Sequence, residues 1–397
     1  GAEPRNAQIE EAWKIVLFNQ FHDILPGSSI REVYIDSAEE YHDAQMIGNY
    51  ELRKALKFIS NNIDTSKVKE GMPLSVFNPL SWERTDVVKL RLPEADMNEY
   101  AVFDLQGKEI ASQIVPARMY AREIIFVAEN IPALGYKTYV LKKQKPAVKT
   151  TNIKISKAEA ENEFYKVAVD PESGWIKSII DKRNGKEILS GPGNELQLLE
   201  DIPAQWDAWN IGLTGKKFPS TLRKTEIMES GPVRVVLRLY RDYLKPGVKK
   251  DFPTEDFPSS FFTQDIILLS GLDRIDFKTD VDWWEEHTML KVAFPLTVNS
   301  TFASYEIPFG SIQRSTQMNT SWEKAKVEVP AARWADLSES GYGVSLLNNS
   351  KYGHDIKGNI NRLSLLRSPN WPDPTADRGK HSIEYSLYPH QGTWKAV

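Results

Sequence analysis

Cysteine is absent from the 397-residue sequence, which excludes disulfide bonds, thiol catalysis and zinc sites built on cysteine. No apolar run is long enough to span a bilayer, so we expect no membrane partner. The formal net charge is −4 at pH 7 and no basic stripe occurs, so we expect no nucleic-acid partner. Metal-binding motifs of the types HxH, HxD and HExxH are also missing, so no short motif assembles a metal site.

The chain is longer than one hydrophobic core usually supports, and its periodicity divides it into three segments. The run from Ala12 to Leu25 is apolar nearly all round, as in a buried helix, and apolar residues from about Ile30 to Asn62 recur at helical spacing. Alternating, β-branched segments separated by turns then predict strands to the end of the chain. We therefore expect a mainly β fold with a helical bundle segment (1–66), a small β-sandwich (72–146) and a large antiparallel β-sandwich (151–397).

Polar side chains interrupt the first apolar run near its end, where His22 and Asp23 precede the turn at Pro26-Gly27. Burying such groups is costly unless each finds a partner, so this pair must form hydrogen bonds, bind a ligand or hold a metal. Ser29 and Glu32 are expected to form a capping box at the start of the second helix. The spacing alone favours a hydrogen-bonded pair inside a helical bundle, because one imidazole cannot complete a zinc site.

Eleven tryptophans are present, and two of them bracket a carboxylate in the segment Trp206-Asp207-Ala208-Trp209. Indole faces stack on sugar rings and a carboxylate can recognise hydroxyl groups, so Trp206, Asp207 and Trp209 are candidate substrate-binding residues. A loop fastened to the sandwich by its tryptophans explains the same pattern equally well.

Two further polar clusters are interpreted as structural. The carboxylates of Glu285 and Glu286 are adjacent in sequence, which is poor geometry for an acid–base pair, so the segment from Trp283 to His287 is expected to be a strand end with surface acids. The polar residues of the late region match no ligand pattern and are expected to be structural. They are His354, Asp355, Asp373, Asp377, His381 and His390.

The segment NQFHDILPGSSI resembles a signature of the class II α-mannosidases, which form family thirty-eight of the glycoside hydrolases. The segments WDAWNI, DRIDFKTDVDWWEEHTMLKVAFPL and LRSPNWPDPTADRGKHSIEYSLYPHQGTW resemble further blocks of that family in the same order. The resemblance covers nearly the whole chain and is closest to the cytosolic, vacuolar and bacterial branch. It implies a helical bundle followed by β domains, the large one of the galactose-mutarotase-like type.

The resemblance also implies hydrolysis of terminal α-mannosides with retention, through a carboxylate nucleophile and a zinc ion, or cobalt in some members. It assigns His22 as a zinc ligand and Asp23 as a contact to sugar or metal, which reverses the interpretation from spacing. The nucleophile and the other zinc ligands of the family lie in an N-terminal domain that nothing in this sequence resembles. We therefore expect a fragment with no catalytic residue of its own, an incomplete zinc site and no activity alone.

Three functions remain open at this point. The chain is the C-terminal part of a retaining α-mannosidase, a non-catalytic carbohydrate-binding β-sandwich, or a purely structural or oligomerising β region. The partners in the first case are a mannose-containing oligosaccharide and the N-terminal catalytic domain of the same protein. The second function requires that the chain alone binds mannosides through its tryptophans.

Overall fold

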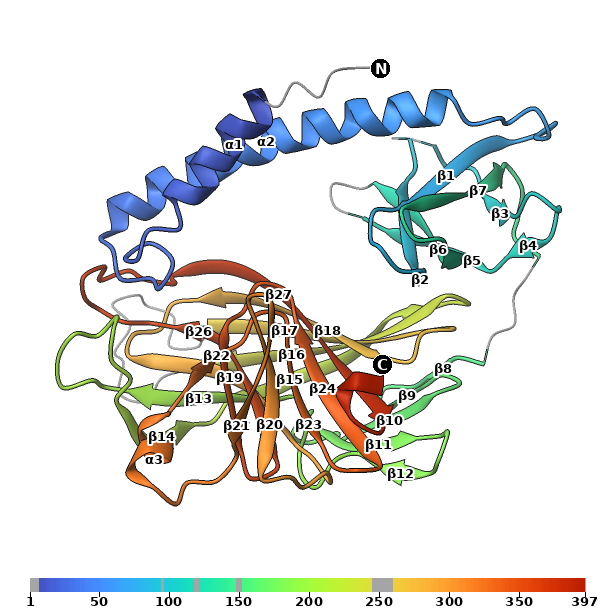
Figure 1. The fold of residues 1–397 in the computed structure, drawn as a ribbon. Helices are drawn as coiled ribbons and strands as arrows, with labels where there is room; N and C mark the ends of the chain where they lie inside the picture. Colours follow the sequence, from blue (N-terminus) through green and yellow to red (C-terminus); the bar gives the residue numbers. More distant parts are fainter. Residues whose placement is uncertain (1–6, 94–95, 118–120, 148–151, 245–259, 397) are drawn as a thin grey trace, which may run out of the picture.

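The computed structural model describes residues 7–93, 96–117, 121–147, 152–244 and 260–396. It confirms the expected fold class: an N-terminal helical segment precedes a small and a large antiparallel β-sandwich (Figure 1). Residues 1–6, 94–95, 118–120, 151, 245–259 and 397 of the expected segments lie outside the described residues. Among the described helices, none is both long and apolar enough to cross a membrane.

The first helix is shorter than expected. Helix α1 (Ala7–Phe18) ends before His22, so the expectation of a helix reaching Leu25 is wrong. The amide of Asn19 explains this end, because its Nδ2 donates to the Ile15 carbonyl (3.0 Å) and to Glu40 Oε2 (2.5 Å). Asparagine commonly ends a helix in this way, since its side chain competes for the backbone hydrogen bonds that would continue the helix.

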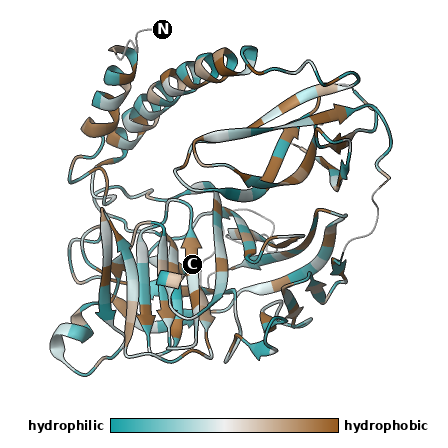
Figure 2. Ribbon diagram, turned by 45° about the vertical axis from the view of Figure 1, so that its right-hand side comes forward, coloured by the Kyte–Doolittle hydropathy of each residue, from teal (hydrophilic) through white to brown (hydrophobic). Residues whose placement is uncertain are grey.

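The two helices pack against each other and leave apolar side chains in solvent. Helix α2 (Arg31–Asn61) runs unbroken over the expected length. No described residue of α1 is buried, and Trp13, Leu17 and Phe18 are more than half exposed, so the expectation of a buried first helix is wrong for this chain. Figure 2 shows the corresponding brown, apolar stretches along both helices.

The expected capping box at the start of α2 is also wrong. The N-cap residue is Ile30, which makes no side-chain cap, and the Ser29 backbone N–H instead donates to the Tyr34 hydroxyl (2.9 Å). A true capping box begins the short helix α3 (Ser321–Ala325), where Thr320 and Glu323 satisfy each other's backbone N–H groups.

The small sandwich consists of a four-stranded and a three-stranded antiparallel sheet, with strand orders β1-β7-β3-β4 and β2-β6-β5. Val102, Ile124, Phe126 and Leu141 belong to the core that the alternating pattern places between them. The strands are β1 (Met72–Asn78), β2 (Arg84–Arg91), β3 (Ala101–Phe103), β4 (Glu109–Ile110), β5 (Ser112–Pro116), β6 (Arg122–Ile131) and β7 (Gly135–Lys142).

The large sandwich contains sheets of five, six and nine strands around one core. The five-stranded sheet has the order β12-β11-β10-β9-β8 and the six-stranded sheet the order β14-β13-β19-β26-β25-β22. Nine strands form the third sheet, in the order β15-β16-β17-β18-β27-β24-β23-β20-β21.

The strands of the large sandwich run from β8 to β27, and a 3₁₀ turn follows them at Trp394–Ala396. Their bounds are β8 (Lys154–Ile155), β9 (Glu159–Glu161), β10 (Tyr165–Val169), β11 (Ile176–Asp181), β12 (Lys186–Glu187), β13 (Glu195–Asp201), β14 (Leu213–Phe218), β15 (Thr221–Ser230), β16 (Arg234–Tyr243), β17 (Ser260–Leu269), β18 (Ile275–Trp283), β19 (Thr288–Pro295), β20 (Phe302–Ile307), β21 (Gly310–Ser315), β22 (Val329–Pro330), β23 (Trp334–Ser338), β24 (Tyr342–Asn348), β25 (Gly353–Lys357), β26 (Ile360–Arg367) and β27 (Gly379–Gln391).

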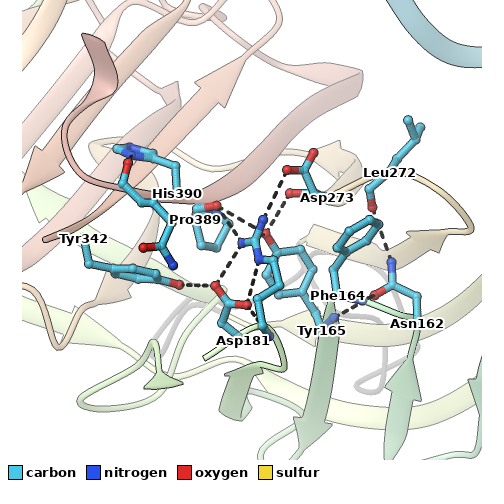
Figure 3. A network of polar contacts seen from close by, with 11 residues as sticks. Asn162, Phe164, Tyr165, Asp181, Leu272, Asp273, Tyr342, Pro389 and His390 are labelled. Carbon is cyan, nitrogen blue, oxygen red and sulfur yellow. Dashed lines mark hydrogen bonds and ion pairs between the residues drawn. The ribbon is translucent and has the colours of Figure 1, made fainter. Parts of the chain in front are cut away.

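A polar network fastens the five-stranded sheet to the nine-stranded one (Figure 3). Arg183 donates to both carboxylate oxygens of Asp181 (2.9 Å each), to Asp273 Oδ2 (3.2 Å) and to the Pro389 carbonyl (3.0 Å). The Tyr342 hydroxyl donates to Asp181 Oδ2 (2.7 Å). Burial works to raise the pKa of Asp181, but these hydrogen bonds hold it below its ordinary value.

A buried histidine in β25 makes the stability of this sandwich depend on pH. His354 is fully buried; its Nε2 accepts from Asn348 Nδ2 (3.3 Å), and Nδ1 has no partner within the described residues. Burial, with the charge of Lys291, lowers the pKa of His354 to about 3. The folded state therefore holds this imidazole neutral, whereas the unfolded chain protonates it below about pH 6.5.

The stabilisation by neutral His354 should be complete above pH 6.5 and decline as the pH falls toward 3. Between pH 7.5 and 4.5 we expect it to remove about 2 to 3 kcal/mol from the free energy of unfolding. His354→Gln, which keeps an acceptor for Asn348, should lose this contribution and show a flatter pH dependence. Urea unfolding at both pH values measures the difference; equal slopes for the two proteins would contradict the assignment.

Candidate functional site

The His22–Asp23 pair lies in the turn between α1 and α2. The imidazole Nε2 is 3.4 Å from Asp23 Oδ2, and 77% of the His22 side chain is exposed. Asp23 is held in place, because its Oδ1 accepts from Ser28 Oγ (2.9 Å) and its carbonyl accepts from the Tyr34 hydroxyl (3.2 Å). The pair is thus an open, oriented imidazole–carboxylate couple rather than one sealed inside a bundle.

The zinc expectation can be compared with the donors that this chain provides. A zinc ion in a protein takes three or four protein ligands. Within the described residues, no three His, Asp or Glu side chains come together to hold a metal ion. His22 and Asp23 offer at most two ligands, so the described residues do not fit a complete zinc site. A metal at His22 requires donors from elsewhere.

The segment Trp206-Asp207-Ala208-Trp209 forms a loop after β13, and its two indoles meet a third one. The ring centroids of Trp206 and Trp209 are 6.1 Å apart, and Trp371 lies 5.1 Å from the first and 5.3 Å from the second. Each of the three side chains is about half exposed. Together Trp206, Trp209 and Trp371 form a surface that we call the indole cluster. It offers apolar ring area to solvent, which suits stacking on a sugar.

Arg367, at the end of β26, fixes the loop that carries two of these indoles. Its Nε donates to Asp201 Oδ2 (2.6 Å), its Nη1 donates to the Ala208 carbonyl (3.2 Å) and its Nη2 donates to the Asn210 carbonyl. Asp201 Oδ1 in turn accepts the backbone N–H of Gly212 (2.6 Å), and a Cβ at Gly212 would lie 2.4 Å from a backbone oxygen. The base of the loop is therefore closed by a buried carboxylate and a guanidinium.

Asp207 points toward neighbouring loops rather than freely into solvent. Its Oδ2 accepts the backbone N–H of Asn370 (3.3 Å) and lies 3.8 Å from His287 Nδ1. Its side chain is 17% exposed. Asp207 therefore positions the loop against Trp371 and retains little freedom to rearrange around a ligand. Its role in hydroxyl recognition stays a prediction.

A cleft of about 960 Å³ adjoins both candidate segments. One side is formed by residues 25–27, directly after His22–Asp23, and another by Ala208 of the tryptophan loop. Trp284 and Asp377 also line this cleft.

The segment after β18 is closer to the candidate site than expected. Trp284 is 55% exposed beside the cleft, and Glu286 pairs with Arg378, which also lines it. Glu285 is not a surface acid: it is 3% exposed and accepts a hydrogen bond from Ser260 Oγ (2.7 Å). The expectation of a surface acid is wrong for Glu285 because the alternation of buried and exposed side chains continues past the end of β18. Trp283 and Glu285 are buried, whereas Trp284 and Glu286 are exposed.

The late polar residues divide between structure and site. His390 is buried and its Nε2 lies 2.8 Å from Asp336 Oδ2, while Asp355 is buried between Lys291 and Arg362. Asp373 and Asp377 belong to the loop that carries Trp371, and both line the cleft. His354 and His381 lie in β25 and β27. Sequence reasoning missed Trp371 and Arg367 because their partners, at residues 201–210, lie more than 150 positions away in the sequence.

Comparison with protein families agrees with this arrangement. Residues 1–59 match the alpha mannosidase middle domain, and residues 160–375 match the C-terminal domain of glycosyl hydrolases family 38. The second match alone covers more than half of the chain. The chain belongs to glycosyl hydrolase family 38. The resemblance that the segment NQFHDILPGSSI and the later blocks carry is thereby confirmed.

Relatives in family 38 align with almost all of this chain. It is 33% identical to alpha-mannosidase 2C1 of Mus musculus over 393 residues, which are 98% of the chain and 34% of the mouse protein. An alpha-mannosidase of Saccharomyces cerevisiae is 30% identical over 97% of the chain and 31% of its own length. The chain thus spans about a third of these curated relatives.

A solved family 38 structure has the same fold. The crystal structure of an alpha-mannosidase from Enterococcus faecalis V583 superposes with a TM-score of 0.82 at 17% identity. The match covers 98% of this chain and 51% of the Enterococcus protein. The helical pair and both sandwiches are therefore one recurring arrangement.

Proposed function

We propose that this chain forms the sugar-facing C-terminal part of a retaining α-mannosidase that acts on terminal α-mannosides of oligosaccharides. The observation that carries the proposal is the cleft where the turn after His22–Asp23 meets the tryptophan loop. Family membership and the named relatives support the reaction. The chain spans about a third of those relatives, so the nucleophile and general acid are assigned to other parts of a longer protein.

The residues of the site have separate roles in this proposal. His22 supplies one ligand to a zinc or cobalt ion, and Asp23 contacts the metal or a sugar hydroxyl. Trp206 and Trp209 stack on sugar rings, and Asp207 binds a hydroxyl or fixes the loop. The ion would hold hydroxyls of the terminal mannose; its other ligands come from outside this chain, since the described residues do not complete a site.

The partner in this proposal is the N-terminal catalytic domain of the same protein. Helices α1 and α2 border an apolar groove of about 630 Å³, whose lining includes Ile9, Trp13, Val16 and Tyr41. Exposed apolar surface of this extent indicates a docking site. Seated there, the partner domain would bring its metal ligands and nucleophile to His22, so we expect no turnover by this chain alone.

His22→Ala in the full-length protein tests the proposed site. Hydrolysis of an aryl α-mannoside with added zinc should fall at least about tenfold in kcat/KM, because even second-shell changes at metal sites cost 10- to 100-fold. Bound zinc, measured by elemental analysis, should fall with it. Lys54→Ala, an exposed change on α2, is the control. Undiminished turnover and zinc content in His22→Ala would contradict the role of this residue.

The exposed indole cluster supports a second candidate function, a carbohydrate-binding module that acts without catalysis. It requires heat on titration of this chain alone with mannose oligosaccharides, and loss of that heat in Trp206→Ala and Trp209→Ala. Binding that survives both substitutions would exclude it.

A further inference from the structure

A row of alternating charges crosses the outer face of the nine-stranded sheet. Strand register places Glu226 opposite Arg238, Arg238 opposite Asp265, Asp265 opposite Lys278, and Lys278 opposite Glu384. These five residues, one from each of β15, β16, β17, β18 and β27, define the charge row. With neighbouring strands about 4.8 Å apart, the row is about 19 Å long. Donor and acceptor side chains therefore alternate at nearly regular steps.

The central part of the charge row forms the floor of a second cleft. Arg238, Asp265, Lys278 and Glu384 line a space of about 1200 Å³, distinct from the cleft beside the indole cluster. Its opposite wall is the small sandwich, where β2 and β6 face the large sheet (Figure 1). This volume exceeds the 300 to 1,000 Å³ of ordinary small-molecule pockets, so it suits a ligand of several units.

Both walls of this cleft are already fastened together. Arg274 donates from Nη2 to Asp86 Oδ1 of the small sandwich and from Nε to Asp276 Oδ1 of the large one, each at 2.9 Å. Gln113 reaches from β5 to the start of β16, where its Oε1 accepts the Arg234 backbone N–H (3.0 Å). The distance between the walls is thereby set by the fold.

Several groups in the cleft keep hydrogen-bonding capacity for a ligand. Within the described part of the chain, the side chains of Lys89, Glu123 and Glu384 have no hydrogen-bond or ion-pair partner. Among the residues that the structure describes, Lys278 forms an ion pair only with Asp280 (3.1 Å), and both side chains are partly exposed. On the floor, Arg238 and Asp265 hold each other in a two-bond pair (2.6 and 2.7 Å), which fixes their orientation. The cleft thus combines rigid and unoccupied polar groups.

We infer that this cleft is a second carbohydrate site, which binds a neutral oligosaccharide along the charge row. Each sugar hydroxyl both donates and accepts a hydrogen bond, so a chain of sugars matches a row in which acceptors and donors alternate. The part of the row that lines the cleft is long enough for more than one hexose unit, and its two acidic and two basic members select no ion. The choice of mannose as the sugar rests on the proposed function, whereas the chemistry of the cleft requires only a neutral polyol.

Other classes of ligand match the cleft less well. A nucleic acid would meet Asp86, Glu123 and Asp276 together with the basic side chains, so its phosphates would be repelled as often as bound. A protein–protein interface normally has an apolar centre that is depleted of charged residues, whereas the centre of this cleft consists of charged residues. The row also stabilises the sheet through opposite cross-strand charges, but that role does not require an open space above it.

Titration of the full chain with a linear mannotriose, followed by calorimetry, tests the inference. The double variant Lys278→Ala/Glu384→Ala removes two polar groups from the cleft floor and should weaken binding at least tenfold. Arg333→Ala, which breaks an exposed ion pair with Glu306 outside the cleft, should leave binding unchanged. Trp206→Ala, at the other cleft, should still release heat on titration with mannotriose. Adding Lys278→Ala and Glu384→Ala to Trp206→Ala should remove that heat.

The outcomes separate this inference from the proposed function. Absence of heat with mannotriose, or equal affinity in the wild type and the double variant, overturns the second site. Loss of all heat in Trp206→Ala with none lost in the double variant also overturns it and assigns binding to the indole cluster. The His22→Ala assay is independent, so either proposal can fail while the other stands. Circular dichroism of the double variant confirms that lost binding is not lost folding.

Discussion

Replacing Lys291 by methionine should lower the free energy of unfolding by about 3 to 5 kcal/mol. The Lys291 side chain is 1% exposed, and its Nζ lies 2.5 Å from Asp355 Oδ2 and 3.3 Å from Glu328 Oε2. Methionine keeps the volume but removes the charge, so two carboxylates lose their nearest cation inside the sandwich. Arg362 still pairs with Asp355, which leaves Glu328 as the carboxylate that loses most.

Urea unfolding of Lys291→Met at neutral pH measures this effect. Lys182→Met is the matched control, because its partner Glu161 is partly exposed and such pairs contribute at most about 1 kcal/mol. Adding Glu328→Gln to Lys291→Met should recover part of the loss, since it removes the carboxylate charge that the first substitution leaves without a cation. A loss below about 1 kcal/mol for Lys291→Met would contradict the importance of this buried cation.

Arg367→Ala should release the loop that carries Trp206 and Trp209. Arg367 holds two loop carbonyls and the 3%-exposed carboxylate of Asp201, so its removal leaves a buried charge and two unmet acceptors. We expect a loss of roughly 3 kcal/mol in the free energy of unfolding, as for other broken buried pairs. The loop should also open locally more often than the strands beside it.

Hydrogen exchange, followed by mass spectrometry, separates these effects in Arg367→Ala. Amides of residues 201–212 should lose protection at least tenfold more than those of β26. Arg367→Lys keeps the charge beside Asp201 but cannot supply the planar fork of donors, so it should recover stability more fully than loop protection. Unchanged protection of residues 201–212 in Arg367→Ala would show that the indoles hold the loop without the guanidinium.

Local sequence patterns predicted the elements whose causes are local. Helix α2 follows its helical spacing from beginning to end, and the strands follow the alternation after it. The predicted end of α1 was wrong because the Asn19 side chain donates a hydrogen bond to Glu40, which lies 21 positions later in the sequence. The Ser29 capping box failed for a similar reason, since the Tyr34 hydroxyl takes the backbone N–H that the box would use.

The candidate site was only partly predictable, because tertiary contacts assemble it. The sequence pointed to Trp206 and Trp209, but the third indole, Trp371, reaches them only through the folded sandwich. In the sequence, Arg367 is one basic residue near the end of a predicted strand. Only the folded structure shows its hydrogen bonds to Asp201, Ala208 and Asn210. The metal role of His22 stays a prediction, since one exposed imidazole shows orientation and access but not its remaining ligands.

The bridges made by Arg274 and Gln113 have a kinetic consequence. A cleft whose walls are fastened before any ligand arrives needs no closing step, so association is governed by diffusion and by shedding of hydration water. The affinity for a ligand that fits would then be determined mainly by its dissociation rate. Substitutions within the cleft should change how long an oligosaccharide stays far more than how fast it arrives.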